Sequence, residues 1–139
     1  MSMDITIYTD GGSRGNPGHA AIGYLVFEND TLLYKHATYI GIASNNVAEY
    51  TALIRALISV KSHNSVLSSI TCYADSELMV KQLKGEYKVK HPDIRPLYNH
   101  IKQLEMELGL VPRYVHVVRE KNKQADALVN QALDAQEKE

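Results

Sequence analysis

Four acidic residues stand where a predicted strand ends or a predicted helix begins, namely Asp10, Glu49, Asp75 and Asp126. Because such boundaries can meet at one edge of a sheet, the four carboxylates could gather there. Carboxylates at close range repel one another, and Mg²⁺ or Mn²⁺, which prefer oxygen ligands, would relieve that repulsion. Two such ions about 3.5–4 Å apart can activate a water and stabilise the leaving oxygen of a phosphodiester. The pattern therefore predicts metal-dependent phosphodiester hydrolysis.

Each acid also has a simple structural explanation. Asp10, next to a glycine, could merely start a turn. Asn46 and Glu49 have nearly the spacing of a capping box, in which the glutamate bonds back to the start of the helix. Asp75 and Asp126 could interact favourably with helix dipoles. The shared position of all four at element boundaries favours the catalytic interpretation.

The elements that would position these acids follow the order βββαβααβα. Residues 5–10, 20–28 and 32–40 read as three strands of an antiparallel meander, with a tight turn at 29–31. The strand at 5–10 is predicted to end at Asp10, where a glycine-rich loop begins.

Later strands alternate with helices. Strands are expected at 69–75 and 114–118. The predicted helices are one from Asn46 to near Ser62–Asn64, a short one capped by Ser76, one capped by Asp93, and a final one that contains Leu128. This alternation predicts an α/β fold, a mixed sheet flanked by helices.

Composition limits the class of protein. A chain of 139 residues suits one domain, 1–139, and 45% hydrophobic residues argue against disorder. A net charge of −1 excludes a protein that coats nucleic acid by bulk charge. No stretch is suited to cross a membrane and the N-terminus lacks a secretory pattern, so we expect a cytoplasmic protein. Cys72 is predicted to be a buried thiol, and nothing indicates an obligate protein partner.

Four ordered motifs resemble type 1 ribonuclease H over nearly the whole chain. They are Thr9-Asp10-Gly11-Gly12 with Gly15-Asn16-Pro17-Gly18, Asn45-Asn46-Val47-Ala48-Glu49, Ala74-Asp75-Ser76, and Arg119-Glu120-Lys121-Asn122 leading to Ala125-Asp126. The resemblance implies the ribonuclease H-like fold, a five-stranded sheet with three antiparallel and two parallel strands. It also implies endonucleolytic cleavage of the RNA strand of RNA–DNA hybrids, with 5′-phosphate and 3′-hydroxyl products.

The resemblance further implies a role for each acid and two Mg²⁺ or Mn²⁺ ions per site. Asp10 would bridge both ions, Asp126 would join it on the ion that activates water, and Glu49 and Asp75 would hold the other.

The resemblance also implies a substrate surface. Asn16, Asn45, Asn46 and the backbone of Gly11 and Gly12 would contact the minor groove of the hybrid. An asparagine amide suits this task because it can both donate to and accept from a ribose 2′-hydroxyl. Ser44, which precedes the Asn45 motif, and Ser76 are predicted to be further substrate contacts.

Two departures from the family pattern concern basic residues. Many members have a histidine in the loop before the last aspartate, whereas this chain resembles the subgroup with an arginine, Arg119, which could hold a phosphate or could be an ordinary surface residue. The basic, tryptophan-containing handle of some relatives is also absent. Lys88 lies in the corresponding region and is predicted to be a reduced phosphate contact, which implies weak, salt-sensitive binding.

Two alternatives to the enzyme remain. The chain could be an inactive or catalytically weak hybrid-binding module on the same fold, since a fold does not prove a reaction. It could also serve mainly as a protein-interaction or scaffold unit of a larger assembly. Retention of all four acids favours the nuclease over the inactive module.

Overall fold

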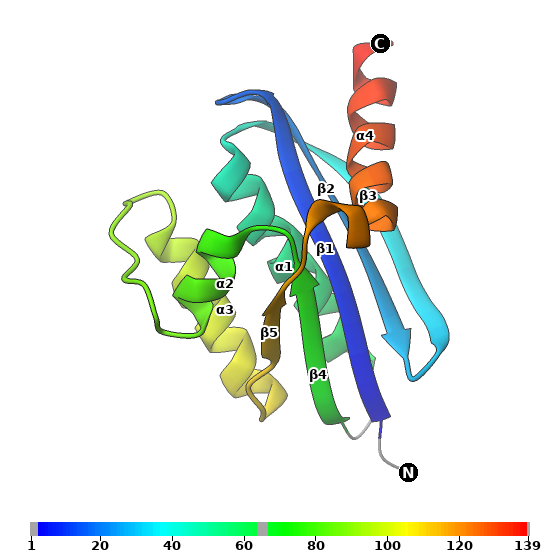
Figure 1. Ribbon diagram of the computed structural model, residues 1–139, viewed down its shortest axis with the longest axis vertical. Coiled ribbons are helices and arrows are strands. Elements are labelled where there is room, and N and C mark those ends of the chain that lie inside the picture. Colours follow the sequence, from blue (N-terminus) through cyan, green and yellow to red (C-terminus); the bar gives the residue numbers. More distant parts are fainter. Residues whose placement is uncertain (1–2, 64–66, 139) are drawn as a thin grey trace.

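The computed structural model describes residues 3–63 and 67–138. It contains one five-stranded sheet with helices on both faces (Figure 1). The elements are β1 (Met3–Gly15), β2 (Gly18–Glu28), β3 (Thr31–Ala43), α1 (Asn45–Ser62), β4 (Leu67–Ala74), α2 (Glu77–Leu83), α3 (Arg95–Leu108), β5 (Arg113–His116), a 3₁₀ turn η1 (Arg119–Lys121) and α4 (Lys123–Glu137). This order confirms the predicted succession of strands and α-helices.

The sheet has the strand order β3-β2-β1-β4-β5. β1 pairs antiparallel with β2 and parallel with β4, while β3 is antiparallel to β2 and β5 is parallel to β4. The predicted mixed sheet, with an antiparallel meander and two parallel strands, is confirmed. β1 lies at its centre, and Asp10 pairs with Gly23 of β2 directly after Thr9, the last β1 residue that pairs with β4.

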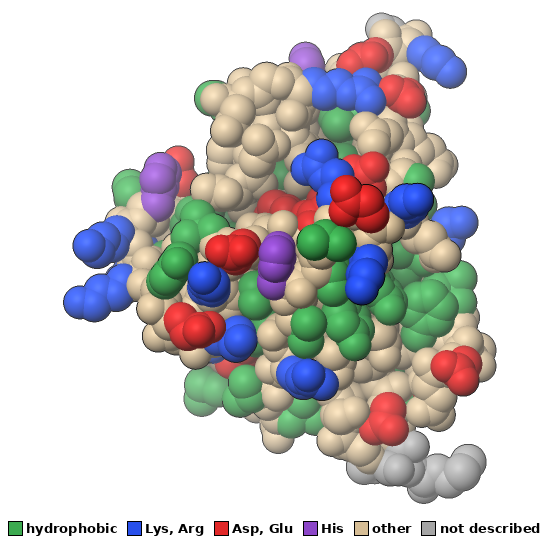
Figure 2. Space-filling model, viewed as in Figure 1, with side chains coloured by type: hydrophobic (Ala, Val, Ile, Leu, Met, Phe, Trp, Pro, Cys, Tyr) green, Lys and Arg blue, Asp and Glu red, His purple; other side chains and the backbone are tan. Residues whose placement is uncertain are grey.

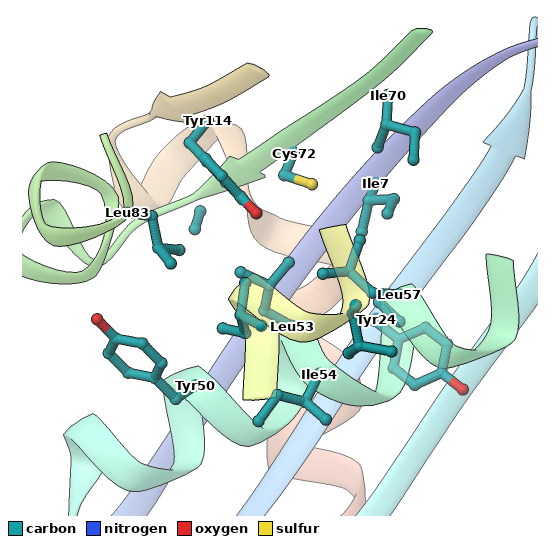
Figure 3. Close-up of a cluster of buried hydrophobic side chains, with 14 of the residues drawn as sticks. Ile7, Tyr24, Tyr50, Leu53, Ile54, Leu57, Ile70, Cys72, Leu83 and Tyr114 are labelled. Carbon is teal, nitrogen blue, oxygen red and sulfur yellow. The ribbon is translucent and has the colours of Figure 1, made fainter. Parts of the chain in front are cut away.

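The main hydrophobic core lies between the sheet and α1, α2 and α3 (Figure 3). Ile5 and Ile7 alternate along β1 with more exposed residues, and both are buried against Leu53 and Leu57 of α1. Cys72 on β4 is fully enclosed in this core, as predicted, and its burial raises the pKa of the thiol.

α4 covers part of the opposite face of the sheet. Leu128 packs with Leu25 of β2, and Val129 packs with Ala21 of the same strand. Figure 1 shows α4 on the other side of the sheet from α1 and α3. Helices therefore pack against both faces of the sheet.

Several predicted boundaries were wrong. β3 extends from Thr31 to Ala43 instead of 32–40, and β4 from Leu67 to Ala74 instead of 69–75. β1 does not end at Asp10 but continues to Gly15, because the backbone of the glycine-rich segment pairs with β2 residue by residue. Asp93 does not cap α3, since its own N–H donates to His91 Nδ1 and the helix begins after Ile94 without a side-chain cap. β5 ends at His116, two residues before the predicted end.

α1 ends at Ser62, as expected, and Asn64 lies outside the described residues. Among the helices in the described ranges, none has the length and apolar character needed to span a membrane.

Candidate active site

Three of the four predicted acids come together at the centre of the sheet. One carboxylate oxygen from each of Asp10, Glu49 and Asp75 lies within 4.8 Å of the others. Asp10 comes from β1, Glu49 from the first turns of α1, and Asp75 directly follows β4. Figure 2 shows acidic side chains gathered in a hollow above the ends of β4 and β5. The predicted convergence on one sheet region is confirmed for these residues.

Gly11 allows α1 to approach β1 closely enough for Glu49 to reach the cluster. A Cβ atom at Gly11 would lie 2.3 Å from the carbonyl carbon of Ala48, so a side chain there would displace the helix. The Gly11 N–H donates to Glu49 Oε1 at 2.7 Å and to Asp10 Oδ1 at 3.0 Å. One backbone donor thus holds two carboxylates together.

The capping-box explanation of Glu49 is wrong. The N-cap of α1 is Ser44, whose side chain accepts from the Val47 N–H at 3.2 Å, so Asn46 is already inside the helix. Glu49 is therefore free to bond across to β1 instead of back to its own helix.

Gly23 allows the equivalent approach of α4 on the other face. Gly23 on β2 is the direct partner of Asp10 in the sheet. A Cβ atom at Gly23 would lie 2.8 Å from the Ala125 carbonyl oxygen and 2.6 Å from Leu128 Cβ. This packing brings the first turn of α4, which carries Asp126, against the backbone beside Asp10.

The cluster is electrostatically strained without a cation. Burial, the charges of Asp75 and Asp126, and a hydrogen bond with Asp126 raise the pKa of Asp10 to about 8. Burial, followed by the charges of Asp10 and Asp75, raises the pKa of Glu49 well above its usual range. Asp126 thus joins the cluster electrostatically through Asp10.

The donor set fits a hard divalent cation. All the clustered donors are carboxylate oxygens, the ligands that Mg²⁺ and Mn²⁺ prefer. Asp75 Oδ2 is buried and has no hydrogen-bond partner among the described residues, although buried polar atoms are normally paired. A bound cation would satisfy this oxygen and would relieve the repulsion that raises the pKa of Asp10 and Glu49.

Comparisons with known proteins show the family of this chain. A family model described as reverse transcriptase-like matches residues 8–132. LC11-RNase H1, solved in complex with an RNA/DNA hybrid, superimposes with a TM-score of 0.90 at 44% identity, over 94% of this chain and 97% of that chain. The chain belongs to the ribonuclease H-like family.

Two curated relatives are longer than this ribonuclease H-like chain. The bifunctional protein Rv2228c of Mycobacterium tuberculosis is 41% identical over 135 residues, which are 96% of this chain and 36% of that protein. Ribonuclease HI of Halobacterium salinarum is 40% identical over 129 residues, 91% of this chain and 63% of that protein. The chain therefore spans between about a third and two thirds of the length of these relatives.

Arg119 lies beside a different acid from the one expected. Its Nε is 3.8 Å from Asp75 Oδ2, and its side chain remains 77% exposed. η1 follows β5, which is the sheet neighbour of β4, so Arg119 lies where β4 ends. The side chain of Asp75 is only 7% exposed, so the pair joins a buried carboxylate to an exposed guanidinium. The guanidinium therefore remains accessible from solvent at the edge of the ribonuclease H-like site.

Two of the predicted substrate asparagines brace the hairpin between β1 and β2. Asn16 Oδ1 accepts from the Asn45 N–H at 3.1 Å, and Asn45 Oδ1 accepts from the Ser13 N–H at 2.9 Å. Both bonds use the carbonyl side of the amide. In the described part of the chain neither Nδ2 group has a partner, and Asn46 is exposed, so these donors face no competing contact.

The remaining predicted substrate residues divide by exposure. Gly11 is buried and its N–H is already bonded to two carboxylates, so this N–H holds the acids, and a substrate contact of the Gly11 backbone stays a prediction. Gly12 is half-buried, and Ser76 caps α2 by accepting from the Met79 N–H at 3.3 Å. Lys88 is exposed between α2 and α3, where a phosphate contact stays a prediction.

Two residues have structural roles that the sequence did not predict. Arg14 pairs with Asp134 and Glu137, which ties the β1–β2 hairpin to the last turns of α4. Asn122 is buried and its Nδ2 donates to the Thr9 carbonyl at 2.8 Å. Its place in the motif before Asp126 was visible in the sequence, but nothing there indicated burial.

Proposed function

We propose that this chain is an endoribonuclease that hydrolyses the RNA strand of RNA–DNA hybrids. The observation that carries the proposal is the buried cluster of Asp10, Glu49 and Asp75 on a ribonuclease H-like fold. It is supported by LC11-RNase H1, whose structure in complex with an RNA/DNA hybrid matches this chain at 44% identity. An inactive binding module would have no need of buried acids held at this electrostatic cost.

The four acids would hold two Mg²⁺ or Mn²⁺ ions. Asp10, at the centre of the cluster, would bridge the ions, Asp126 would bind one with it, and Glu49 and Asp75 would bind the other. When bound, such ions would activate the attacking water and stabilise the leaving oxygen. We expect 5′-phosphate and 3′-hydroxyl ends. The chain itself holds Asp10 and Glu49 in place through the Gly11 N–H.

The exposed asparagines would distinguish RNA from DNA. The Nδ2 groups of Asn16 and Asn45 stand beside the glycine-rich hairpin and can donate to 2′-hydroxyl oxygens. Asn46 and the backbone of Gly12 would extend this surface, and Lys88 would contact a phosphate. Since the chain has a net charge of −1, we expect few phosphate contacts and binding that weakens with salt.

A substrate panel tests the proposal. The purified protein is incubated with end-labelled RNA–DNA, DNA–DNA and RNA–RNA duplexes of one sequence in Mg²⁺, in Mn²⁺ and in EDTA. We expect a ladder from the RNA strand of the hybrid with either metal and none in EDTA. Hybrid binding without cleavage under both metals would refute the enzyme and support a binding module.

A further inference from the structure

Asn122 connects the backbone segments that carry two of the acids. It is the N-cap residue of α4 and is 2% exposed. Its side-chain Nδ2 donates to the carbonyl of Thr9, the residue before Asp10, at 2.8 Å. Its own carbonyl accepts from the N–H of Asp126 at 3.1 Å. One residue therefore links β1 next to Asp10 with α4 at Asp126 through two hydrogen bonds.

This orientation of the Asn122 side chain lowers the stability of the fold in two ways. An asparagine at an N-cap normally accepts a bond from the N–H groups of the first helical turn, but α4 has no side-chain cap bond. Asn122 Oδ1 is also buried without a partner among the described residues, as is Thr9 Oγ1. Both features are unfavourable for folding. Stability alone would favour a side chain that turns back to cap α4.

The hydrogen bond from Asn122 to Thr9 adds directionality, which the apolar packing of α4 cannot supply. Gly23 lets Ala125 and Leu128 press against β2, but such contacts tolerate small sliding movements because they have little directional preference. A hydrogen bond is directional. The bond from Asn122 to Thr9 therefore fixes the start of α4 at one position along β1.

We propose that Asn122 is a positioning residue that sets the spacing between the carboxylates of Asp10 and Asp126 for a shared divalent cation. This inference rests on the proposed function, because it assumes that these two acids bind metal together. Asn122 itself is buried beneath the site and acts only through the backbone of its two neighbours.

The test uses a variant that separates positioning from helix capping. In Asn122→Ser the hydroxyl can cap α4, but it is too short to replace the amide that donates to Thr9. Mn²⁺ affinity is measured by calorimetry without nucleic acid, and hybrid affinity is measured in Ca²⁺. Steady-state cleavage gives kcat and KM, and all assays run where circular dichroism shows each variant folded.

We expect Asn122→Ser to lower Mn²⁺ affinity and kcat by about tenfold or more, as for residues that orient metal ligands. Hybrid affinity in Ca²⁺ and KM should change less than about twofold, because the substrate surface lies elsewhere. Excess Mn²⁺ should restore part of the activity. Asn122→Ala should show the same losses together with lower thermal stability.

Tyr114→Phe is the matched control. It also removes a buried hydrogen bond, the one from the Tyr114 hydroxyl on β5 to Glu105 Oε2 on α3 at 2.7 Å. It should lower thermal stability while leaving Mn²⁺ affinity and kcat unchanged.

Two results would overturn the proposal. One is wild-type Mn²⁺ affinity in Asn122→Ser. The other is a loss of affinity that only follows the loss of stability, with Tyr114→Phe equally affected. If the wild-type protein binds Mn²⁺ but leaves hybrids intact, the proposed function fails on its own, and the affinity comparison still decides the role of Asn122.

Discussion

Replacing Asp10 by Asn should stabilise the metal-free protein at neutral pH and have little effect at pH 5. The pKa of Asp10 rises from 3.8 to about 8 on folding, mainly through burial. Between these values the folded protein holds a proton that the unfolded chain releases, so this group makes stability fall as pH rises. Asparagine removes the titration but can still accept the Gly11 N–H bond at the same oxygen.

The size of the effect follows from the difference between the pH of the assay and the pKa of Asp10 in the unfolded chain. At pH 7 the unfolded carboxylate is about 3 units above its pKa, which at 1.36 kcal/mol per unit sets an upper bound of about 4 kcal/mol. At pH 5 the same reasoning gives at most about 2 kcal/mol. Because Glu49 shares the repulsion and can hold a proton in turn, we expect a gain of about 2 kcal/mol at pH 7 and below about 1 kcal/mol at pH 5.

The assay is guanidinium chloride denaturation in EDTA at pH 5, 7 and 8. Asp30→Asn, in the exposed turn between β2 and β3, is the control and should show no gain over wild type that grows with pH. Mg²⁺ should reverse the order, since a ligand at 100 times its Kd adds about 2.7 kcal/mol to a protein that binds it. Equal destabilisation by Asp10→Asn at all three pH values would refute the account of a strained acid cluster.

Three further predictions concern the surroundings of the cluster. The double variant Asn45→Ala with Asn46→Ala should weaken hybrid affinity in Ca²⁺, and circular dichroism checks that it is folded. Normal binding and cleavage by the folded variant would show that both residues are structural. Arg119→Ala should slow turnover by about ten- to a hundredfold with Arg119→Lys only partly restored, and wild-type turnover would reduce Arg119 to a surface residue. Gly11→Ala should destabilise the fold and abolish cleavage, because its Cβ would lie 2.3 Å from the backbone of α1; a folded, active variant would show that the helix can shift.

The order of the elements and the convergence of Asp10, Glu49 and Asp75 could be predicted from the sequence. Hydrophobic periodicity indicates which segments are strands and which are helices, and the alternation of the two predicts a sheet covered by helices. Burial of Cys72 and capping by Ser76 followed from local patterns in the same way.

Other features depend on backbone approach, which has no local signature. The glycines at 11 and 23 are contact points for α1 and α4, yet in the sequence they resemble ordinary turn or strand glycines. Asn46 and Glu49 have capping-box spacing, but Ser44 caps α1 and Glu49 accepts a hydrogen bond from the Gly11 N–H of β1. Asn122 could not be told from a surface cap, because its side chain is recruited by a strand 113 residues away.

The most direct test of the central claim compares wild-type protein with Asp10→Asn on one hybrid whose RNA and DNA strands carry different end labels. Both proteins are prepared identically and assayed in Mg²⁺, with Asp30→Asn as a third, matched preparation. The account predicts fragments of the RNA strand only, from wild type and Asp30→Asn, and none from Asp10→Asn. Equal cleavage by Asp10→Asn, or cleavage of the DNA strand, would contradict it.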